Sequence, residues 1–194
     1  YATCMDVENF DKQLQMFEDV TRKLDFQIPA GETPPGVGRS VFMDAYATFA
    51  RWHMKKYGST KKQLATICSK NHYHGSLNPK SQFQETMTVD EVLNARPVTY
   101  PLTVPMCAPV GDGAAAAILC SERYLRKLKN ARPVRILASV LGTGTNRGME
   151  GVDIGERLSR KAYETAGIGP DDIDLAELHD ATAYGELHQC EAMG

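Results

Sequence analysis

His179 and Asp180 are the residues of this chain whose types and position best fit catalysis. They follow the short apolar segment 175–178, which we predict to be a buried strand, and they precede a helix predicted over 183–193. Ligands of open α/β sheets bind at the carboxyl ends of strands, and a helix N-terminus presents free N–H groups. A neutral imidazole placed there can donate a hydrogen bond to a developing oxyanion. By placement alone, a packed histidine that only closes the turn is an equally good interpretation.

Two groups of metal-binding residue types are present, but neither has the spacing of a metal site. Cys68, His72 and His74 form a single C-x-x-x-H-x-H pattern, and the other group is His179 with His188. Zinc sites usually show two ligand pairs at recurring spacing. We therefore expect no bound metal, and we interpret the loop histidines as hydrogen-bonded to backbone carbonyls.

The cysteines predict a reducing compartment rather than a nucleophile. The chain has five of them, an odd number, and no C-x-x-C pair. We interpret them as reduced thiols and expect a cytoplasmic location. None is followed by the small-residue and glycine pattern of a nucleophile at a helix N-terminus, and no G-x-S-x-G elbow occurs. The sequence therefore offers no nucleophile of its own.

The first half of the chain predicts two helices followed by a long loop. Ser40 is a good N-cap and Gly58 a good C-terminal stop. Thr60 and Gln63 form a capping box that opens a second helix. The frequent prolines of 71–109 predict an ordered loop, of the kind that often carries function. The first helix is expected to bury one apolar stripe, made of Phe42, Ala45, Tyr46, Phe49, Ala50 and His53.

The second half predicts a parallel α/β layer. Residues 134–141 are rich in β-forming types, a helix is expected from about Asp153 to the stop at Gly167, and the segment 175–178 follows. Alternating strands and helices are typical of parallel sheets. Because such crossovers are right-handed, we predict that 134–141 and 175–178 are neighbouring parallel strands.

Composition excludes several classes of protein. The chain has 194 residues, 24% of them charged, and 22 Lys+Arg against 24 Asp+Glu give a net charge of -2. This is average globular composition, which argues against disorder and gives no reason to expect nucleic acid as a partner. The longest uncharged apolar run, 113–120, is far shorter than the roughly 20 residues that span a bilayer. We expect no membrane span.

Three segments resemble motifs of thiolases of the sterol-carrier-protein type. They are KNHYHGSLNP at 70–79, PLTVPMCAPVGDGAAA at 101–116 and HDAT at 179–182. The resemblance implies the thiolase-like fold, an α/β architecture of two similar halves stacked as αβαβα layers. Residues 1–130 would form the loop region and end of the N-terminal half, and 131–194 would open the C-terminal half. Since the family's nucleophilic cysteine and second acid/base residue match nothing here, we expect a piece of a larger protein, incomplete as an enzyme.

The activity that this resemblance implies is that of an acyl-CoA thiolase in lipid metabolism. Such an acyltransferase, of the acetyl-CoA acyltransferase type, cleaves or forms a carbon–carbon bond next to a coenzyme A thioester. Coenzyme A thioester would be a substrate, and no cofactor would be bound permanently. His179 matches the family's oxyanion-hole position. The segment along the pantetheine arm of coenzyme A is matched by Met106, Cys107, Ala108 and Pro109.

One departure from the family motif leaves two alternatives open. Thr182 replaces the family's aromatic residue, and Tyr184 follows two residues later. Some thiolase-like proteins run retro-aldol cleavage of CoA-linked side chains with tyrosines and a small OB-domain partner; others are non-catalytic subunits. The resemblance thus implies a homodimer or tetramer, or a hetero-oligomer with an OB-type protein. A cysteine at the strand–helix junction of the N-terminal half would favour thiolysis, and its replacement would favour the alternatives.

Overall fold

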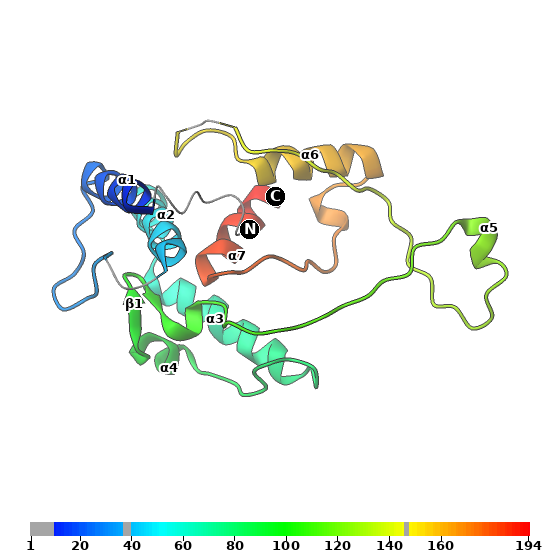
Figure 1. The fold of residues 1–194 in the computed structure, drawn as a ribbon, viewed down its shortest axis with the longest axis horizontal. Coiled ribbons are helices and arrows are strands. Elements are labelled where there is room, and N and C mark those ends of the chain that lie inside the picture. Colours follow the sequence, from blue (N-terminus) through cyan, green and yellow to red (C-terminus); the bar gives the residue numbers. More distant parts are fainter. Residues whose placement is uncertain (1–9, 37–39, 146–147) are drawn as a thin grey trace. The chain divides into compact units, whose positions relative to one another are not determined.

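The computed structural model describes residues 10–36, 40–145 and 148–194 (Figure 1). The contacts within the chain divide it into two units. The first unit comprises Tyr1–Pro109 and Leu178–Gln189, and the second comprises Val110–Glu177 and Cys190–Gly194. The first unit is therefore built from two segments that are distant in sequence. It contains the whole of the first and third motifs and residues 101–109 of the second.

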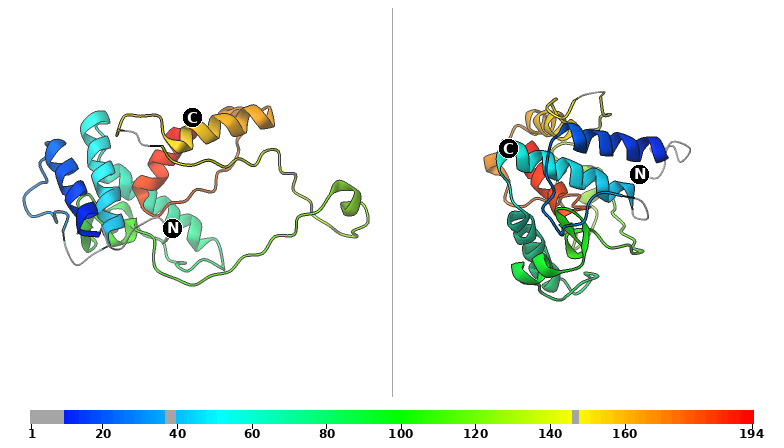
Figure 2. Two further views of the ribbon diagram at one scale, coloured as in Figure 1. Left: turned by 45° about the horizontal axis from the view of Figure 1, so that its top comes forward. Right: turned by 90° about the vertical axis from the view of Figure 1, so that its left-hand side faces the viewer.

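The first unit is mainly helical. Its helices α1 and α2 lie side by side (Figure 2), α3 packs against α4 and the 3-10 turn η3, and α2 contacts β1. The strands β1 and β2 form an antiparallel pair in which Thr99 lies opposite Leu102. In chain order the elements are α1 Phe10–Lys23, α2 Val41–Tyr57, α3 Lys61–Ser76, α4 Val89–Asn94, β1 Pro97–Thr99, β2 Leu102–Thr103, η3 Val104–Met106 and α7 Ala183–Met193, of which the part up to Gln189 belongs to this unit.

The core of this unit joins α2, α3, α4 and the start of α7. Burial of apolar side chains from all four helices is the main term that holds them together. Met106 of the second motif and Tyr184, two residues after the third motif, both belong to this core. Its buried members are Ala47, Ala50, Leu64, Ala65, Cys68, Val92, Leu102, Met106, Ala183 and Tyr184.

Helix α2 has the predicted ends but buries a partly different face. Gly58 adopts the left-handed conformation with φ 75°, and its N–H donates to the Met54 carbonyl, as expected for a C-terminal stop. The predicted apolar stripe is confirmed for Ala50 and His53, which are buried, but it is wrong for Phe42 and Phe49, which are 41% and 37% exposed. The buried face instead carries Asp44 and Arg51. Polar side chains occupy it because they find hydrogen-bond partners inside the unit.

Arg51 is the centre of that buried polar network. Its Nη1 donates to the Tyr100 carbonyl at 2.6 Å, and its Nη2 donates to the hydroxyls of Thr21 and Thr48 at 3.0 and 2.9 Å. Burial lowers the pKa of Arg51 to about 10, and the charge of Asp44 opposes that decrease. The guanidinium therefore stays charged at neutral pH and links α1, α2 and the end of β1.

Helix α3 begins at the predicted capping box but ends later than expected. Thr60 and Gln63 exchange both hydrogen bonds of the box. The helix then continues to Ser76, so the prediction of one loop over 71–109 is wrong. The loop that follows returns to α3 at Gly75, where a Cβ atom would lie 3.0 Å from the Phe83 carbonyl oxygen. Gly75 therefore does not end the helix; its missing side chain lets the loop backbone pack closely against α3.

The second unit contains α5 Glu122–Leu125, α6 Ile154–Ala166, the 3-10 turn η4 Pro170–Asp172 and the end of α7. The ends of α6 are as predicted: Asp153 caps it by accepting from the Gly155 N–H at 2.7 Å, and Gly167 stops it at φ 71°. Helix α7 also has the predicted bounds. No helix among the described residues is long and apolar enough to cross a membrane.

The two strands predicted in the second half of the chain do not form. Residues 134–141 and 175–178 have no regular secondary structure, and Val134, Leu141 and Leu175 are largely exposed. In the described part of the chain the paired strands are β1 and β2. A strand is held by hydrogen bonds to a neighbouring strand, and β-propensity without a neighbour does not supply them. The prediction that these segments are parallel neighbours is therefore wrong for this structure.

Candidate functional site

The turn of the third motif, 179–182, is fixed to the second motif through backbone contacts. Thr182 and Cys107 form an antiparallel bridge, and the Ala108 N–H donates to the Ala181 carbonyl at 3.0 Å. Thr182 is fully buried, and its hydroxyl accepts from the Gly185 N–H at 3.2 Å. The residue that replaces the family's aromatic therefore caps α7.

The first motif reaches the same turn through Asn71. Its Nδ2 donates to Asp180 Oδ2 at 3.1 Å and to Glu186 Oε2 at 2.6 Å. The Lys70 ammonium lies 2.7 Å from the other oxygen of Glu186. Asn71 and Asp180 are 109 residues apart in sequence. The three motifs thus meet at one place, although they come from three distant parts of the chain.

Asp180 shares this place with a second carboxylate. Burial raises the pKa of Asp180, and the negative charge of Glu186 raises it further. A backbone hydrogen bond and the electrostatic effects of His179 and Lys70 act in the opposite direction. The net rise means that Asp180 holds its proton to a higher pH than an ordinary aspartate does.

His179 is exposed at the surface of the first unit, next to this carboxylate pair. It differs in this from His53, which is buried with its Nδ1 2.8 Å from the Ser59 hydroxyl. The backbone N–H of His179 donates to Gln189 Oε1 at 3.3 Å. A ligand has access to an exposed imidazole whose backbone is held in this way.

The four residues predicted to line the pantetheine arm differ in accessibility. Met106 is buried in the core and Cys107 is half-buried, whereas Ala108 and Pro109 are exposed. Ala108 lies beside the third motif through its bond to Ala181. A ligand can therefore contact Ala108 and Pro109 directly, while Met106 fixes the start of the segment by packing in the core. Their role in binding stays a prediction.

Tyr184 is a core residue rather than a surface acid or base. It is 4% exposed. Its ring lies edge-on to His53 and stacked on His188, each with centroids 6.0 Å apart. A tyrosine enclosed in this way does not face solvent.

Two members of the C-x-x-x-H-x-H pattern, Cys68 and His72, have structural partners. Cys68 donates from Sγ to the Pro105 carbonyl at 2.9 Å, and His72 Nδ1 lies 3.2 Å from the Glu85 carbonyl oxygen. The interpretation of His72 as a histidine bonded to a backbone carbonyl is confirmed. Within residues 10–36, 40–145 and 148–194, no three His, Cys, Asp or Glu side chains gather as a metal site.

Two thiols close to the site are expected to react slowly. Burial raises the pKa of Cys68 to about 12 and that of Cys107 to about 11. The thiolate is the reactive form, so at pH 8 only about a thousandth of Cys107 is reactive. Cys120 and Cys190 are exposed. In a short alkylation at pH 8 followed by mass spectrometry of peptides, Cys120 and Cys190 are modified first, and Cys107 catches up only as the pH approaches 11. Equal rates at pH 8 would contradict this.

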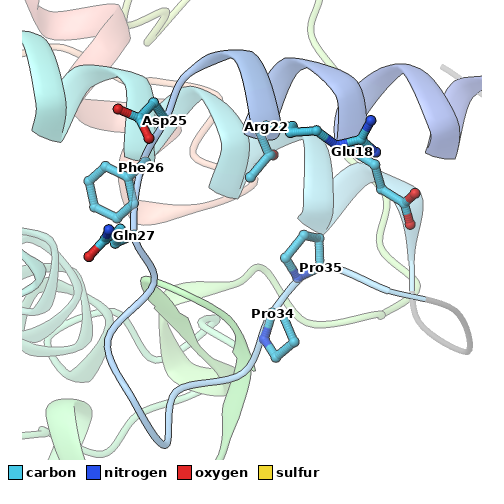
Figure 3. Close-up of a pocket in the computed structure, with 8 residues that line it drawn as sticks. Glu18, Arg22, Asp25, Phe26, Gln27, Pro34 and Pro35 are labelled. Carbon is cyan, nitrogen blue, oxygen red and sulfur yellow. The ribbon is translucent and has the colours of Figure 1, made fainter.

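A pocket of about 420 Å³ lies elsewhere in the first unit, between the end of α1 and the loop that follows it (Figure 3). Its wall mixes charged side chains with aromatic and proline rings. No residue of the three motifs lines it, so the pocket and the motif-bearing turn are separate features. The lining residues are Glu18, Thr21, Arg22, Asp25, Phe26, Gln27, Pro34 and Pro35.

Comparison with known proteins agrees with the motifs. The family model described as "Thiolase C-terminal domain-like" matches residues 152–194. The benzoylsuccinyl-CoA thiolase subunit BbsB of Thauera aromatica is 38% identical over 159 residues, which are 80% of this chain and 41% of that protein. Sterol carrier protein 2 of Bos taurus is 40% identical over 174 residues, 84% of this chain and 31% of that protein. The chain is thiolase-like.

The solved structures add a match at the level of the fold. A chain of the structure described as "Ltp2-ChsH2(DUF35) aldolase" superposes with a TM-score of 0.68 and 25% identity, over 78% of this chain and 42% of that chain. The thiolase-like chain thus spans less than half the length of each of these proteins. The resemblance inferred from the three motifs is confirmed.

Sequence reasoning missed three residues that this geometry brings to the turn. Asn71 belongs to a recognised motif, but its spacing alone gives no chemical role. Glu186 and Gln189 lie on the predicted helix 183–193, about one and two helical turns after its start. Side chains of a helix tilt toward its N-terminus, so these two point back toward residues 179–182. That helical spacing was the only available signal.

Proposed function

We propose that the complete protein is an acyl-CoA thiolase, an acyltransferase acting on the carbon–carbon bond next to a coenzyme A thioester. The meeting of the three motifs at the turn 179–182 is the observation that carries this proposal. The similarity to a thiolase subunit over 80% of the chain supports it. For the whole protein we propose the two-half αβαβα architecture, with residues 1–130 and 131–194 in different halves.

In this proposal His179 acts on the thioester oxygen. When the bond next to the thioester breaks, the electron pair that it leaves behind delocalises onto that oxygen as an enolate. A neutral imidazole that donates a hydrogen bond there stabilises the charge as it forms. The exposure of His179 leaves room for the thioester. The nucleophile and the second acid/base group would come from parts of the protein that this chain does not include.

The segment Met106–Pro109 would hold coenzyme A in this proposal. Ala108 and Pro109 offer the exposed surface along which the pantetheine arm would run, beside Ala181. Met106 and Cys107 would fix that surface, Met106 through the core and Cys107 through the bridge to Thr182. Coenzyme A would be a substrate that binds and leaves in each turnover.

A second candidate is a thiolase-like retro-aldolase of CoA-linked side chains. The structural match to a protein described as an aldolase favours it, as does Thr182 in the place of an aromatic residue. In that case we propose a hetero-oligomer with a small OB-type protein. For a thiolase we propose a homodimer or tetramer. A third candidate, a non-catalytic subunit, rests on the nucleophile missing from these residues.

One assay of the complete protein, run alone and together with any small protein that co-purifies with it, separates the three. It is incubated with a 3-ketoacyl-CoA plus free coenzyme A, and separately with a 3-hydroxyacyl-CoA, with products identified by mass spectrometry. A thiolase consumes coenzyme A and gives acetyl-CoA with a shortened acyl-CoA. A retro-aldolase gives acetyl-CoA and an aldehyde or ketone from the hydroxy compound without consuming coenzyme A. Absence of both products would overturn the proposal of an enzyme acting alone and favour the subunit.

A further inference from the structure

The side-chain amide of Gln189 pairs with the backbone of His179 in both directions. Gln189 Nε2 donates to the His179 carbonyl, and the His179 N–H donates to Gln189 Oε1 at 3.3 Å. The remaining amide hydrogen of Gln189 is directed to the Gly185 carbonyl, with Nε2 and that oxygen 3.1 Å apart. The opposite orientation of the amide would set its oxygen against two carbonyl oxygens. The three contacts therefore specify one orientation.

This arrangement ties the residue proposed for catalysis to a regular helix. Gln189 lies on α7, two turns beyond the turn that holds His179, and Gly185 lies one turn before Gln189 on the same helix. A backbone paired on both its donor and its acceptor has little freedom to rotate. The direction of the His179 side chain depends on that backbone, since φ and ψ determine which rotamers are allowed.

The neighbours of His179 are held by different residues. Asn71 holds the Asp180 side chain, and Ala108 holds the Ala181 carbonyl. Gln189 supplies contacts to both backbone groups of His179 itself. Replacing Gln189 therefore acts on the position of the imidazole while leaving the links between the three motifs in place.

We propose that Gln189 is a positioning residue, which fixes the backbone of His179 so that its imidazole points at the thioester oxygen. The inference rests on the proposed function of His179. A displacement of about 1 Å at a reacting group can cost on the order of 100-fold in rate. Loss of the Gln189 amide thus lowers kcat about 10- to 100-fold and leaves KM for the thioester nearly unchanged.

Replacement by glutamate gives a pH-dependent version of the same contact. A protonated carboxyl group can donate to the His179 carbonyl and accept from its N–H, as the amide does, but an ionised one can only accept. The activity of Gln189→Glu relative to the wild type therefore rises as the pH falls. The titratable groups around the turn are Lys70 on α3, His179 and Asp180 in the turn, and Glu186 and His188 on α7. All five are present in both proteins, so the ratio isolates position 189.

The test compares Gln189→Ala and Gln189→Glu with matched changes at Gln84, in the complete protein. Gln84 also donates to two backbone carbonyls, those of Pro79 and Ser81 at 2.9 and 3.3 Å, in the loop between α3 and α4. Steady-state kinetics from pH 5.5 to 8.5 are expected to show the kcat loss and the acid recovery at position 189 only. Equal effects at positions 84 and 189, or a flat activity ratio for Gln189→Glu, would overturn the proposal.

Hydrogen exchange of the His179 amide provides a readout that needs no activity. Because that N–H donates to Gln189, Gln189→Ala is expected to speed its exchange, with little change at the Thr182–Cys107 bridge. Unchanged exchange would overturn the positioning role even if kcat fell. A wild-type protein inactive on both the 3-ketoacyl-CoA and the 3-hydroxyacyl-CoA would instead refute the proposed function, and faster exchange would still support the contact itself.

Discussion

Replacing His179 with alanine in the complete protein is expected to lower kcat about 100- to 1,000-fold while KM for the thioester changes little. The imidazole would act on charge that collects on the thioester oxygen only in the transition state. Its loss therefore weakens transition-state binding far more than substrate binding. Steady-state kinetics of the purified variant, with a thermal melt to verify folding, measure this directly.

His72→Ala is the matched control for that experiment. His72 also lies in a motif and is half-exposed, whereas His179 is exposed; the His72 ring stacks on Phe83 and its Nδ1 faces the Glu85 carbonyl. Its removal is expected to change kcat by less than about threefold, since no charge develops next to it in the proposed reaction. Near-normal kcat in a well-folded His179→Ala protein would make His179 a surface histidine without a catalytic role.

Arg51→Ala is expected to lower the free energy of unfolding of the first unit by about 3–5 kcal/mol, the largest stability effect that we predict. The change leaves the Tyr100 carbonyl without its guanidinium donor and Asp44 without the nearby positive charge. Asp44 is buried and accepts from the Gly36 N–H at 3.2 Å, while its other oxygen has no partner among the described residues. An uncompensated buried carboxylate is costly.

Denaturant unfolding of the complete protein, followed by hydrogen exchange in α2, measures this loss. Lys55→Ala, an exposed cation on the same helix, is expected to cost less than about 1 kcal/mol. In an Asp44→Asn background the cost of Arg51→Ala should shrink, because no buried charge remains to be compensated. A loss below about 1 kcal/mol for Arg51→Ala would refute the role of this network.

The helix ends were predictable because their signals are local. A capping residue and a left-handed glycine act within one turn of the helix, as at Asp153 and Gly167. The face that α2 buries was not predictable, since Arg51 is buried only because Tyr100, far along the chain, supplies an acceptor. Burial of a charge depends on partners that a helical pattern does not contain.

The prediction of strands at 134–141 and 175–178 was wrong for the same reason, because a strand also depends on partners elsewhere in the chain. The composition of 134–141 favours extended backbone, but a sheet also needs a neighbour in register. At the site, the motifs identified His179, whereas its supports at Asn71 and Gln189 became visible only through contacts in space. Residue type and order marked His179 as the candidate; they did not predict which side chains hold it.

The two-segment construction of the first unit has a consequence for biosynthesis. A ribosome makes Tyr1–Pro109 first and then the whole of Val110–Glu177 before it delivers Leu178–Gln189. The nascent chain can form α2 and α3 early, because their capping signals are local. Asn71 can donate its hydrogen bonds to Asp180 and Glu186 only after the late segment has been made. Until then Cys107 and Ala108 lack their backbone partners Thr182 and Ala181. The core around Met106 also lacks the side chains that α7 contributes. Nascent chains stalled before residue 178 should therefore be the form of this protein that most needs a chaperone.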